Sequence, residues 1–464
     1  MLRAKIIASI GPSSEDPKII RELYIAGVDC FRINFSHGDL DSWSRYIEAI
    51  RAVEKEFNDK ICVLGDLRGP SIRLGDLKEN MSISKGSKVV FSRDPSKGIP
   101  VDSDEFFKIV DEGDMILMDD GKIRFEVIRV AYEEVEAIAL TDSILSSRKN
   151  IAVRGKSLKS SIFSPRDSKA IEFSVREGIT YIGVSHVRDR RDIEIIRKSI
   201  RGLGGNQRIL AKIENRIAID NLREIIHSSD GVVIARGDLG MSLGLEEIPR
   251  VQEEIVRESR RLGKPVILAT QLLESMIKSP IPTRSEVQDI YSGVLYGVDG
   301  FMLTGETAVG SYPIEAVKWL RKIVDTSEKY LYESGRSYNE IRYRVEEISD
   351  PAEKFFYGVV KLAESLNAYM LLFSSSGSSA IKVSSLRPRV EVICGTNRSD
   401  VFTSLKILWG VEPVYVDAKN HEDGLDKTLK IALERELIER GRMIVLAYAI
   451  PSEDKYVVSI KRAL

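Results

Sequence analysis

Eight short apolar runs, each closing on a polar or charged residue, recur along the first two thirds of this 464-residue chain. Runs this short and this apolar are typical of strands that are buried on both faces, as in a parallel sheet. They occupy residues 5–11, 30–36, 61–67, 181–187, 208–214, 231–238, 265–271 and 300–307. Eight such strands, separated by stretches of helical pattern, predict a (β/α)8 TIM barrel, an α/β fold whose active site lies at the carboxyl ends of its strands.

The residues that close these runs predict an enzyme. Charged side chains at the ends of buried strands cost free energy unless they bind or react with something. The closing set comprises Arg32, Asn34, Asp66, Arg68, Lys212, Glu214, Arg236, Asp238, Thr270 and Glu306. Because the carboxyl ends of the strands meet at one end of a barrel, we expect these side chains to surround a single cleft.

Composition and charge narrow the range of functions. The chain carries 69 basic and 70 acidic residues, so its overall charge favours neither nucleic acid nor an anionic membrane surface. Its apolar runs fall short of the roughly 20 residues that span a bilayer. Three widely separated cysteines and a start without a signal-peptide core predict free thiols in a cytoplasmic protein.

The alternation of helix and strand breaks twice, which predicts three domains. Residues 71–152 carry short alternating segments around an Asp120-Gly121 turn, so we expect a small β-barrel lid domain inserted in a barrel loop. Residues 336–464 return to strands and helices and predict a C-terminal open α/β domain. The catalytic barrel is then discontinuous, formed by residues 1–70 and 153–335.

Local signals predict where some elements begin and end. Ser164 before Pro165, and Thr283 three residues before Glu286, are typical of helix N-termini. Gly297 follows a helical stretch and precedes an apolar run, as a left-handed C-cap does. The short link over residues 451–454 predicts an antiparallel strand at the edge of the last sheet.

Two carboxylates that end neighbouring strands suggest a metal site. Glu214 and Asp238 suit a hard cation such as Mg²⁺, and the alternative is salt bridges to Lys212 and Arg236. Lys212 lies two residues before Glu214, so both side chains point the same way along the strand. A lysine there stabilises negative charge in a transition state or forms a Schiff base, and the nearby carboxylates favour the first role.

The other polar residues at the strand ends favour phosphoryl transfer. Arg32 and Asn34 share one face of their strand, and Arg32 suggests a planar anion, with an ion pair to Glu306 or Asp66 as the alternative. The four histidines lack the partners of a catalytic triad or a zinc site; they are His37, His186, His227 and His421. A cation, a lysine, an arginine and carboxylates under a lid supply the positioning and charge neutralisation that phosphoryl transfer requires.

Six motifs, in order and spacing across the whole barrel, resemble the pyruvate kinase family. They are residues 10–14 (IGPSS), 32–38 (RINFSHG), 212–215 (KIEN), 235–240 (ARGDLG), 269–276 (ATQLLESM) and 302–308 (MLTGETA). The inserted and C-terminal parts match the arrangement of that family too. The resemblance implies a kinase that transfers the phosphoryl group of phosphoenolpyruvate to ADP, giving pyruvate and ATP in the final step of glycolysis.

The resemblance implies a role for each residue of the catalytic centre. Glu214 and Asp238 would hold Mg²⁺ or Mn²⁺. Lys212 would neutralise charge on the phosphoryl group in transfer and on the enolate, and Arg32 would bind the transferring phosphate. The backbone amides of Gly237 and Asp238, at a helix start, would receive the substrate carboxylate.

Further positions follow from the same resemblance. Thr270 would lie near the enolate face, in a water relay that protonates the enolate. The residues that match the nucleotide side are Asn34, His37, Arg73 and Asp120, and those that match a monovalent-cation site are Asn34, Ser36, Asp66 and Leu67. We interpret His37 as a residue that orders a loop or contacts a ligand.

Two segments depart from the family's pattern. Where potassium-dependent members read Asp-Thr-Lys-Gly-Pro-Glu, residues 66–71 read DLRGPS. The replacement of the threonine by Leu67 and of the glutamate by Ser71 predicts that K⁺ is not required, with Arg68 as a candidate for the missing charge. His186 stands where the family usually has phenylalanine.

A run of small residues in the C-terminal part predicts an effector site. The loop Ser374-Ser375-Ser376-Gly377-Ser378-Ser379 precedes a helix, and hydroxyls, a glycine and a helix N-terminus form an anion cradle. The alternative is plain N-capping by one serine. Pyruvate kinases place effector phosphates at a similar loop, so we expect a phosphorylated allosteric effector, AMP or a sugar monophosphate, acting on a homotetramer.

Two other functions fit parts of the pattern. Other barrels bind Mg²⁺ and pyruvate-like enolates and cleave carbon–carbon bonds, but they lack the lid and the C-terminal part. An inactive paralogue that senses metabolites usually loses the lysine or the metal carboxylates. Lys212, Glu214 and Asp238 are all present, so we expect an active kinase.

Overall fold

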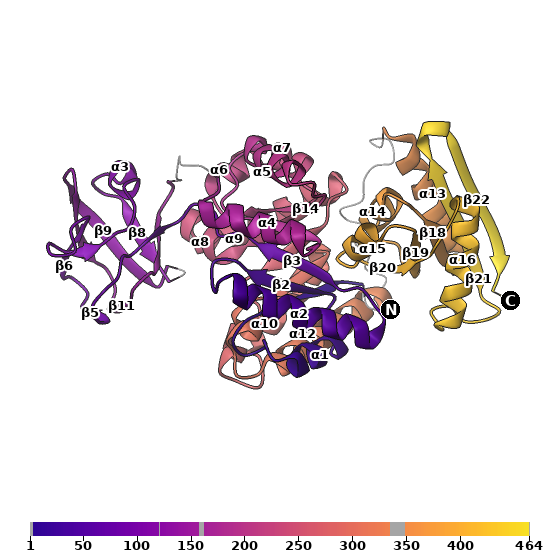
Figure 1. The fold of residues 1–464 in the computed structure, drawn as a ribbon, viewed down its shortest axis with the longest axis horizontal. Coiled ribbons are helices and arrows are strands. Elements are labelled where there is room, and N and C mark those ends of the chain that lie inside the picture. The colour runs from indigo at the N-terminus through magenta and orange to yellow at the C-terminus, as the bar shows by residue number, and fades with distance from the viewer. Residues whose placement is uncertain (1–2, 120, 157–161, 335–348, 464) are drawn as a thin grey trace.

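The computed structural model describes residues 3–119, 121–156, 162–334 and 349–463, which form three parts that lie in a row (Figure 1). The middle part is a closed barrel of eight parallel strands, in the spatial order β1-β17-β16-β15-β14-β13-β3-β2. The strands are β1 (Lys5–Ile10), β2 (Cys30–Asn34), β3 (Cys62–Asp66), β13 (Tyr181–Val184), β14 (Arg208–Ile213), β15 (Gly231–Ala235), β16 (Val266–Ala269) and β17 (Gly300–Leu303). Each predicted run contains one of them, and the predicted TIM barrel is confirmed.

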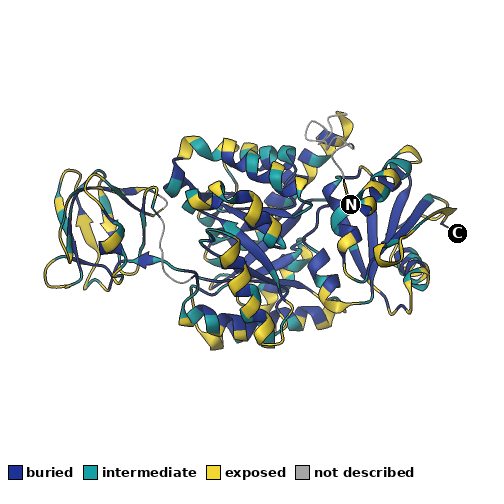
Figure 2. Ribbon diagram, turned by 90° about the horizontal axis from the view of Figure 1, so that it is seen from above, coloured by how far each residue is buried: buried dark blue, intermediate teal, exposed yellow. Residues whose placement is uncertain are grey.

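Helices surround the barrel with their apolar faces against the strands, which leaves their outer faces exposed (Figure 2). They are α1 (Pro17–Ile25), α2 (Leu40–Phe57), α4 (Pro165–Arg176), α5 (Arg190–Gly202), α6 (Arg216–Asp220), α7 (Leu222–Ser228), α9 (Ile248–Arg261), α10 (Arg284–Tyr296) and α12 (Pro313–Glu333). Two further helices, α8 (Arg236–Leu243) and α11 (Gly305–Ala308), follow at the carboxyl ends of β15 and β17. The predicted helix starts are confirmed, because Ser164 and Thr283 each form a capping box. Gly297 caps α10 with φ +80°.

The inserted part leaves the barrel after β3 and returns before α4. Its main sheet has the order β4-β12-β8-β9-β10-β6-β7, with β11 and β5 paired separately. The elements are β4 (Ile72–Arg73), β5 (Met81–Ile83), β6 (Lys88–Ser92), β7 (Ile99–Pro100), α3 (Phe106–Ile109), β8 (Met115–Met118), β9 (Ile123–Val130), β10 (Glu134–Ala139), β11 (Ser143–Leu145) and β12 (Asn150–Val153). It has its own apolar core, where the ring of Phe91 contacts Phe106 and Phe125 edge to face.

The C-terminal part is an open five-stranded sheet with apolar clusters on both faces. Its strand order is β20-β19-β18-β21-β22. The elements are α13 (Pro351–Ser365), β18 (Tyr369–Phe373), α14 (Ser378–Ser385), β19 (Val392–Thr396), α15 (Ser399–Leu405), β20 (Val411–Tyr415), α16 (His421–Glu434), β21 (Met443–Ile450) and β22 (Lys455–Arg462). The predicted edge strand is confirmed, because β22 pairs antiparallel with β21 alone.

A buried ion pair joins the C-terminal part to the amino ends of the barrel strands. The guanidinium of Arg387 donates to both carboxylate oxygens of Asp299, at 3.1 and 2.8 Å, and both side chains are almost fully buried. Asp299 directly precedes β17, whose other end reaches the far side of the barrel. The ring of Trp409 lies 5.1 Å from the Arg387 guanidinium and 5.3 Å from that of Arg3. In the part of the chain that is described, no helix is both long and apolar enough to span a membrane.

Candidate active site

A cleft of about 540 Å³ opens at the carboxyl ends of the barrel strands. Most of the predicted site residues line it together: Arg32, Asn34, Ser36, His37, Asp66, Leu67, Arg73, Lys212, Glu214, Asp238 and Thr270. Gly237 adjoins it, since its amide donates to the hydroxyl of Thr270 at 2.9 Å. Asp120, predicted on the nucleotide side, lies outside the described residues.

Lys212 lies at the centre of the charges in the cleft. Its ammonium is 2.9 Å from Oε1 of Glu214 and 3.4 Å from Oδ2 of Asp66, and it donates to Oγ of Ser185 at 2.8 Å. Burial alone lowers the pKa of this ammonium, but the two carboxylates outweigh burial and raise the pKa above its usual range. Lys212 is therefore charged, which favours charge stabilisation over Schiff-base chemistry.

Arg32 is held in place by its neighbours. Its Nε and Nη2 donate to Oδ2 of Asp66 at 2.9 and 2.5 Å, and its Nη1 donates to Oγ of Ser9 at 2.8 Å. Of the two alternative partners for Arg32, the structure contains the ion pair to Asp66, whereas Glu306 accepts backbone amides. Burial raises the pKa of Asp66, but Lys212 and Arg32 outweigh it and hold that pKa below its usual value. The pairing fixes the guanidinium of Arg32 at the wall of the cleft.

One carboxylate oxygen of Glu214 lacks a hydrogen bond from the part of the protein that is described. Its Oε1 is buried and accepts no hydrogen bond of regular geometry from the described residues, although the Lys212 ammonium is within ion-pair distance. Its Oε2 accepts the backbone amide of His186 at 2.7 Å. With Asp238 on the same cleft, the donors are carboxylate oxygens, which fit a divalent cation that also takes substrate and water as ligands.

The donors of this cleft do not by themselves complete a metal site. Among the residues that the structure describes, no group of three or more His, Cys, Asp or Glu side chains is arranged to hold an ion. Salt bridges to Lys212 and Arg236 were the alternative to a metal site for the two carboxylates. One of them is present, between Glu214 and Lys212. Arg236, the other base considered, pairs with Asp289 at 2.5 Å.

Thr270 is fixed by the start of α8. Arg236 donates to the carbonyl of Thr270 at 3.2 and 2.8 Å, while the Gly237 amide donates to its hydroxyl. Thr270 has φ +66° and Gln271 has φ +52°, a backbone region that residues with side chains adopt when their surroundings fix them. The hydroxyl of Thr270 is thereby held against the N-terminal amides of α8, where an anion is favoured.

The side of the cleft that carries His37 is strongly positive. Burial, then Arg73, Arg32 and Arg166, lower the pKa of His37 below its usual value. Burial, followed by Arg68 and Arg166, lowers the pKa of Arg73, whose Nε is buried without a hydrogen-bond partner among the described residues. Guanidinium groups gathered in this way are suited to phosphate oxygens.

Two serines of the cleft were missed as site residues by the sequence analysis. Ser9 contacts Arg32, and Ser185 both accepts from Lys212 and donates to the carbonyl of Leu67 at 2.8 Å. A signal for Ser9 existed, because it is a polar residue near the end of an apolar run and pairs in register with Arg32 on the neighbouring strand. Ser185 likewise follows directly after β13.

The serine loop of the C-terminal part is ordered by its own hydrogen bonds. The Gly377 amide donates to Oγ of Ser374 at 3.0 Å, and the Ser376 hydroxyl donates to that of Ser378 at 3.0 Å. Gly377 is the N-cap of α14, and the amide of Ser378, the first residue of the helix, donates to Oγ of Ser376 at 3.4 Å, so the capping alternative is partly present. Arg208 of the barrel donates weakly to the carbonyl of Ser376, at 3.4 Å.

Comparisons with known proteins identify the family. The family model described as the pyruvate kinase barrel domain matches residues 1–317, and the model of the pyruvate kinase alpha/beta domain matches residues 353–458. The pyruvate kinase of Aeropyrum pernix is 40% identical over 453 residues, which cover 97% of this chain and 96% of that protein. The pyruvate kinase of Pyrobaculum aerophilum is 38% identical over 435 residues, covering 92% and 91%.

Solved structures agree with the sequence relatives. The crystal structure of the pyruvate kinase from Pyrobaculum aerophilum has a TM-score of 0.85 and 34% identity, and it covers both chains completely. That of a pyruvate kinase from Cryptosporidium parvum has a TM-score of 0.90 and 28% identity, covering 100% of this chain and 96% of the other. The chain belongs to the pyruvate kinase family.

Proposed function

We propose that the cleft at the carboxyl ends of the barrel strands is where this chain performs the reaction of its family. That reaction transfers a phosphoryl group from phosphoenolpyruvate to ADP and yields pyruvate and ATP, so the chain is a glycolytic phosphotransferase. The observation that carries the assignment to this cleft is the charged ammonium of Lys212, held between the buried carboxylates of Asp66 and Glu214. Phosphoryl transfer depends on such fixed charges rather than on a covalent intermediate.

Lys212 and Arg32 would supply the positive charge in the transfer step. The ammonium of Lys212 would neutralise charge on the phosphoryl group and on the enolate oxygen that it leaves. Arg32, fixed by Asp66 and Ser9, would bind the phosphate oxygens without having to reorganise. Fixed donors aimed at developing charge are usually the largest single contribution to catalysis.

Pyruvate kinases use a divalent metal ion, and in this chain Glu214 and Asp238 would hold it, as Mg²⁺ or Mn²⁺. The partly unsatisfied oxygen Oε1 of Glu214 supports this assignment. Once bound, the ion would supply charge neutralisation at the substrate's oxygens. The amides of Gly237 and Asp238 would receive the substrate carboxylate, which would take over the Gly237 amide from Thr270. The hydroxyl of Thr270 would then face the enolate and deliver a proton through water.

The positive side of the cleft would hold the nucleotide. Asn34, His37 and Arg73 line it, and Asp120 would close on it from the inserted part. The monovalent site expected at Asn34, Ser36, Asp66 and Leu67 would not need K⁺, because Arg68 lies on the same side and its Nε donates to Ser71 at 3.3 Å. A guanidinium there would replace the charge of a bound potassium ion.

We also propose how the whole chain is organised. Residues 1–70 with 153–335 would be the catalytic domain, 71–152 the lid and 336–464 the regulatory domain, each with its own apolar core. β12 (Asn150–Val153) runs one residue past the proposed lid boundary, and the boundary at 335 lies outside the described residues. A cytoplasmic homotetramer regulated by a phosphorylated effector at Ser374–Ser379 completes the proposal.

A coupled assay tests the proposed function. The purified chain, ADP and phosphoenolpyruvate, with lactate dehydrogenase and NADH, should consume NADH when Mg²⁺ or Mn²⁺ is present and stop when a chelator removes it. Omitting ADP separates kinase activity from any carbon–carbon cleavage or hydrolysis that yields pyruvate. Pyruvate formation that needs no ADP would contradict the proposal.

A further inference from the structure

Two strands of the inserted part carry buried polar atoms that lack hydrogen-bond partners and lie beside the cleft. They are the acceptor Oδ1 of Asn150 and the donor Nε of Arg73, and neither forms a hydrogen bond within the described part of the chain. A buried polar atom without a partner costs free energy, so each such atom calls for an explanation, such as a role at a functional site. The proposed function places Arg73 at the nucleotide and does not use Asn150.

The pairing of β4 with β12 puts these two side chains on one face of the sheet. Arg73 and Asn150 are register partners on the two antiparallel strands, and Ile72 is the partner of Ile151. Side chains of such partners project from the same face, with their Cβ atoms about 5 Å apart. Ile72 and Ile151 belong to the apolar core of the inserted part, whereas Arg73 and Asn150 line the cleft.

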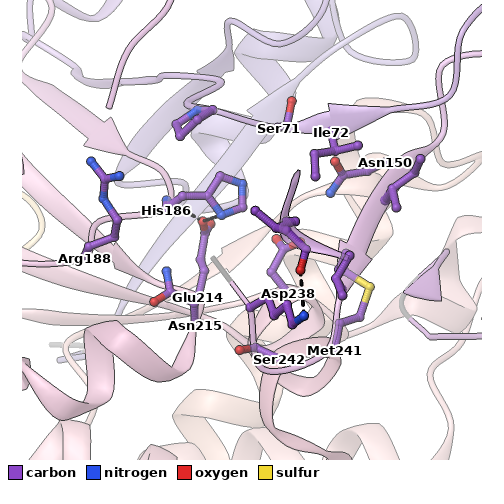
Figure 3. Close-up of a pocket in the computed structure, with 16 residues that line it drawn as sticks. Ser71, Ile72, Asn150, His186, Arg188, Glu214, Asn215, Asp238, Met241 and Ser242 are labelled. Carbon is purple, nitrogen blue, oxygen red and sulfur yellow. Dashed lines mark hydrogen bonds and ion pairs between the residues drawn. The ribbon is translucent and has the colours of Figure 1, made fainter. Parts of the chain in front are cut away.

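Asn150 lies where the two ends of the proposed active site meet. It lines the cleft of about 540 Å³ together with Lys212, and it also lines the adjoining cavity of Glu214 and Asp238. Figure 3 shows Asn150 across that cavity from Glu214. Of the described residues of the inserted part, only Ser71 and Asn150 line both spaces. The amide is therefore close to the route between the phosphoryl donor and the nucleotide.

The two atoms without partners are complementary. The guanidinium of Arg73 is held by its Nη1, which donates to the carbonyl of Arg148 at 3.3 Å and leaves Nε without an acceptor. An asparagine amide has an acceptor oxygen and two N–H donors. A hydrogen bond from Nε of Arg73 to Oδ1 of Asn150 would satisfy both atoms and direct Nδ2 away from Arg73.

We propose that Asn150 positions the nucleotide, by accepting from Nε of Arg73 and donating from Nδ2 to an oxygen of the terminal phosphate of ADP. The proposal rests on the proposed function, in which Arg73 lies on the nucleotide side. Burial and the charges of Arg68 and Arg166 already lower the pKa of Arg73. A neutral amide adds a hydrogen bond to the phosphate without adding to the repulsion among these guanidinium groups.

Steady-state kinetics with ADP and phosphoenolpyruvate varied separately tests this role. Asn150→Ala should raise KM for ADP by about tenfold, the effect of losing one hydrogen bond to a charged group, and change KM for phosphoenolpyruvate by less than about twofold. Asn150→Asp keeps the size of the side chain but places a carboxylate beside the phosphate, so it should raise KM for ADP further. Asn80→Ala, at an exposed position of the same inserted part, is the matched control and should change neither KM.

A double-mutant cycle tests the bond between the two side chains. If Arg73 and Asn150 act together on the nucleotide, Asn150→Ala should raise KM for ADP less in the Arg73→Ala background than in the wild-type protein. Strictly additive effects overturn the proposed bond.

The remaining outcomes separate this proposal from the proposed function. An equal rise of both KM values in Asn150→Ala would mean that the inserted part is displaced as a whole, and the specific role of Asn150 is then wrong. If wild-type protein turns over normally and Asn150→Asp keeps the wild-type KM for ADP, only the role of Asn150 is overturned. If the wild-type protein forms no pyruvate from phosphoenolpyruvate and ADP, the proposed function itself fails, and this proposal fails with it.

Discussion

At the scale of single residues, the neighbours of a charged side chain in the cleft determine its protonation state and its position. Lys212 stays protonated because two carboxylates outweigh its burial, and Arg32 stays in place because Asp66 and Ser9 bind it. Arg32, Lys212 and Glu214 follow from the sequence because each closes a predicted strand. Their mutual contacts do not follow, since an ion pair such as Arg32–Asp66 depends on distances across the barrel.

Replacing His37 with glutamine should make the protein less sensitive to mild acid. Burial, together with Arg73, Arg32 and Arg166, lowers the pKa of His37 below its usual value. The folded protein therefore binds this proton less readily than the unfolded chain does, so wild-type stability falls as the pH drops from about 7.5 to about 5.5. The midpoint of thermal unfolding should fall less in His37→Gln over that range, and equal decreases would contradict the account.

K⁺ should not activate the enzyme. Leu67 and Ser71 supply no carboxylate to a monovalent ion, and Arg68 is close enough to Ser71 to place a fixed charge there. Activity is measured in tetramethylammonium chloride and again in KCl at the same ionic strength. An increase in activity of about tenfold or more on adding K⁺ would refute the prediction. Such an increase would mean that the enzyme without K⁺ lacks over ~1 kcal/mol of transition-state stabilisation. The double variant Leu67→Thr/Ser71→Glu should gain K⁺ dependence.

Among helices and strands, periodicity and caps were enough to predict the barrel but not the elements at its rim. The eight runs, the capping boxes at Ser164 and Thr283 and the edge strand β22 are all present. Asp238 lies in the first turn of α8, at the helix start that the family resemblance implied, whereas Glu306, expected at a strand end, lies in α11. Such short helices have too few residues for a period, and backbone hydrogen bonds at the rim decide where they form.

The ion pair between Arg387 and Asp299 should be essential to the stability of the barrel and C-terminal part together. Asp299→Ala leaves the buried Arg387 guanidinium without its carboxylate, which costs about 3–5 kcal/mol. The urea midpoint of unfolding should fall accordingly. Asp76→Ala, which breaks the exposed pair to Arg148, is the control and should leave the urea midpoint close to that of the wild-type protein. Similar midpoints for the two variants would contradict the assignment.

The serine loop before α14 should respond to a phosphorylated metabolite. Its amides and hydroxyls bond to one another at Ser374, Ser376 and Ser378, and a phosphate would replace those bonds. AMP or a sugar monophosphate should shift half-saturation by phosphoenolpyruvate, and Ser376→Glu or Ser378→Glu should abolish the shift by repelling the anion. A shift that survives both substitutions, or no shift with any compound, would leave the loop without an effector role.

In the whole molecule, the cleft lies where the inserted part meets the carboxyl ends of the barrel strands. The inserted part contributes Ile72 and Asn150 to the cavity that holds His186, Glu214 and Asp238 (Figure 3). The C-terminal part packs at the opposite, amino ends of the same strands, through Arg387 and Asp299. The breaks in the alternation of strands and helices along the sequence predicted this division into parts. The sequence carries no signal for how the parts pack against one another.

The most direct measurement on the central claim is the turnover of Lys212→Met. If the Lys212 ammonium neutralises charge in the transferring phosphoryl group and the enolate, kcat should fall by about 10³ or more. Mn²⁺ binding through Glu214 and Asp238 should persist, while the midpoint of thermal unfolding should fall, because the buried carboxylates of Asp66 and Glu214 lose the Lys212 ammonium. Lys212→Arg, which keeps the charge, should recover part of the activity. Near-normal kcat in a folded, metal-binding Lys212→Met would contradict the account.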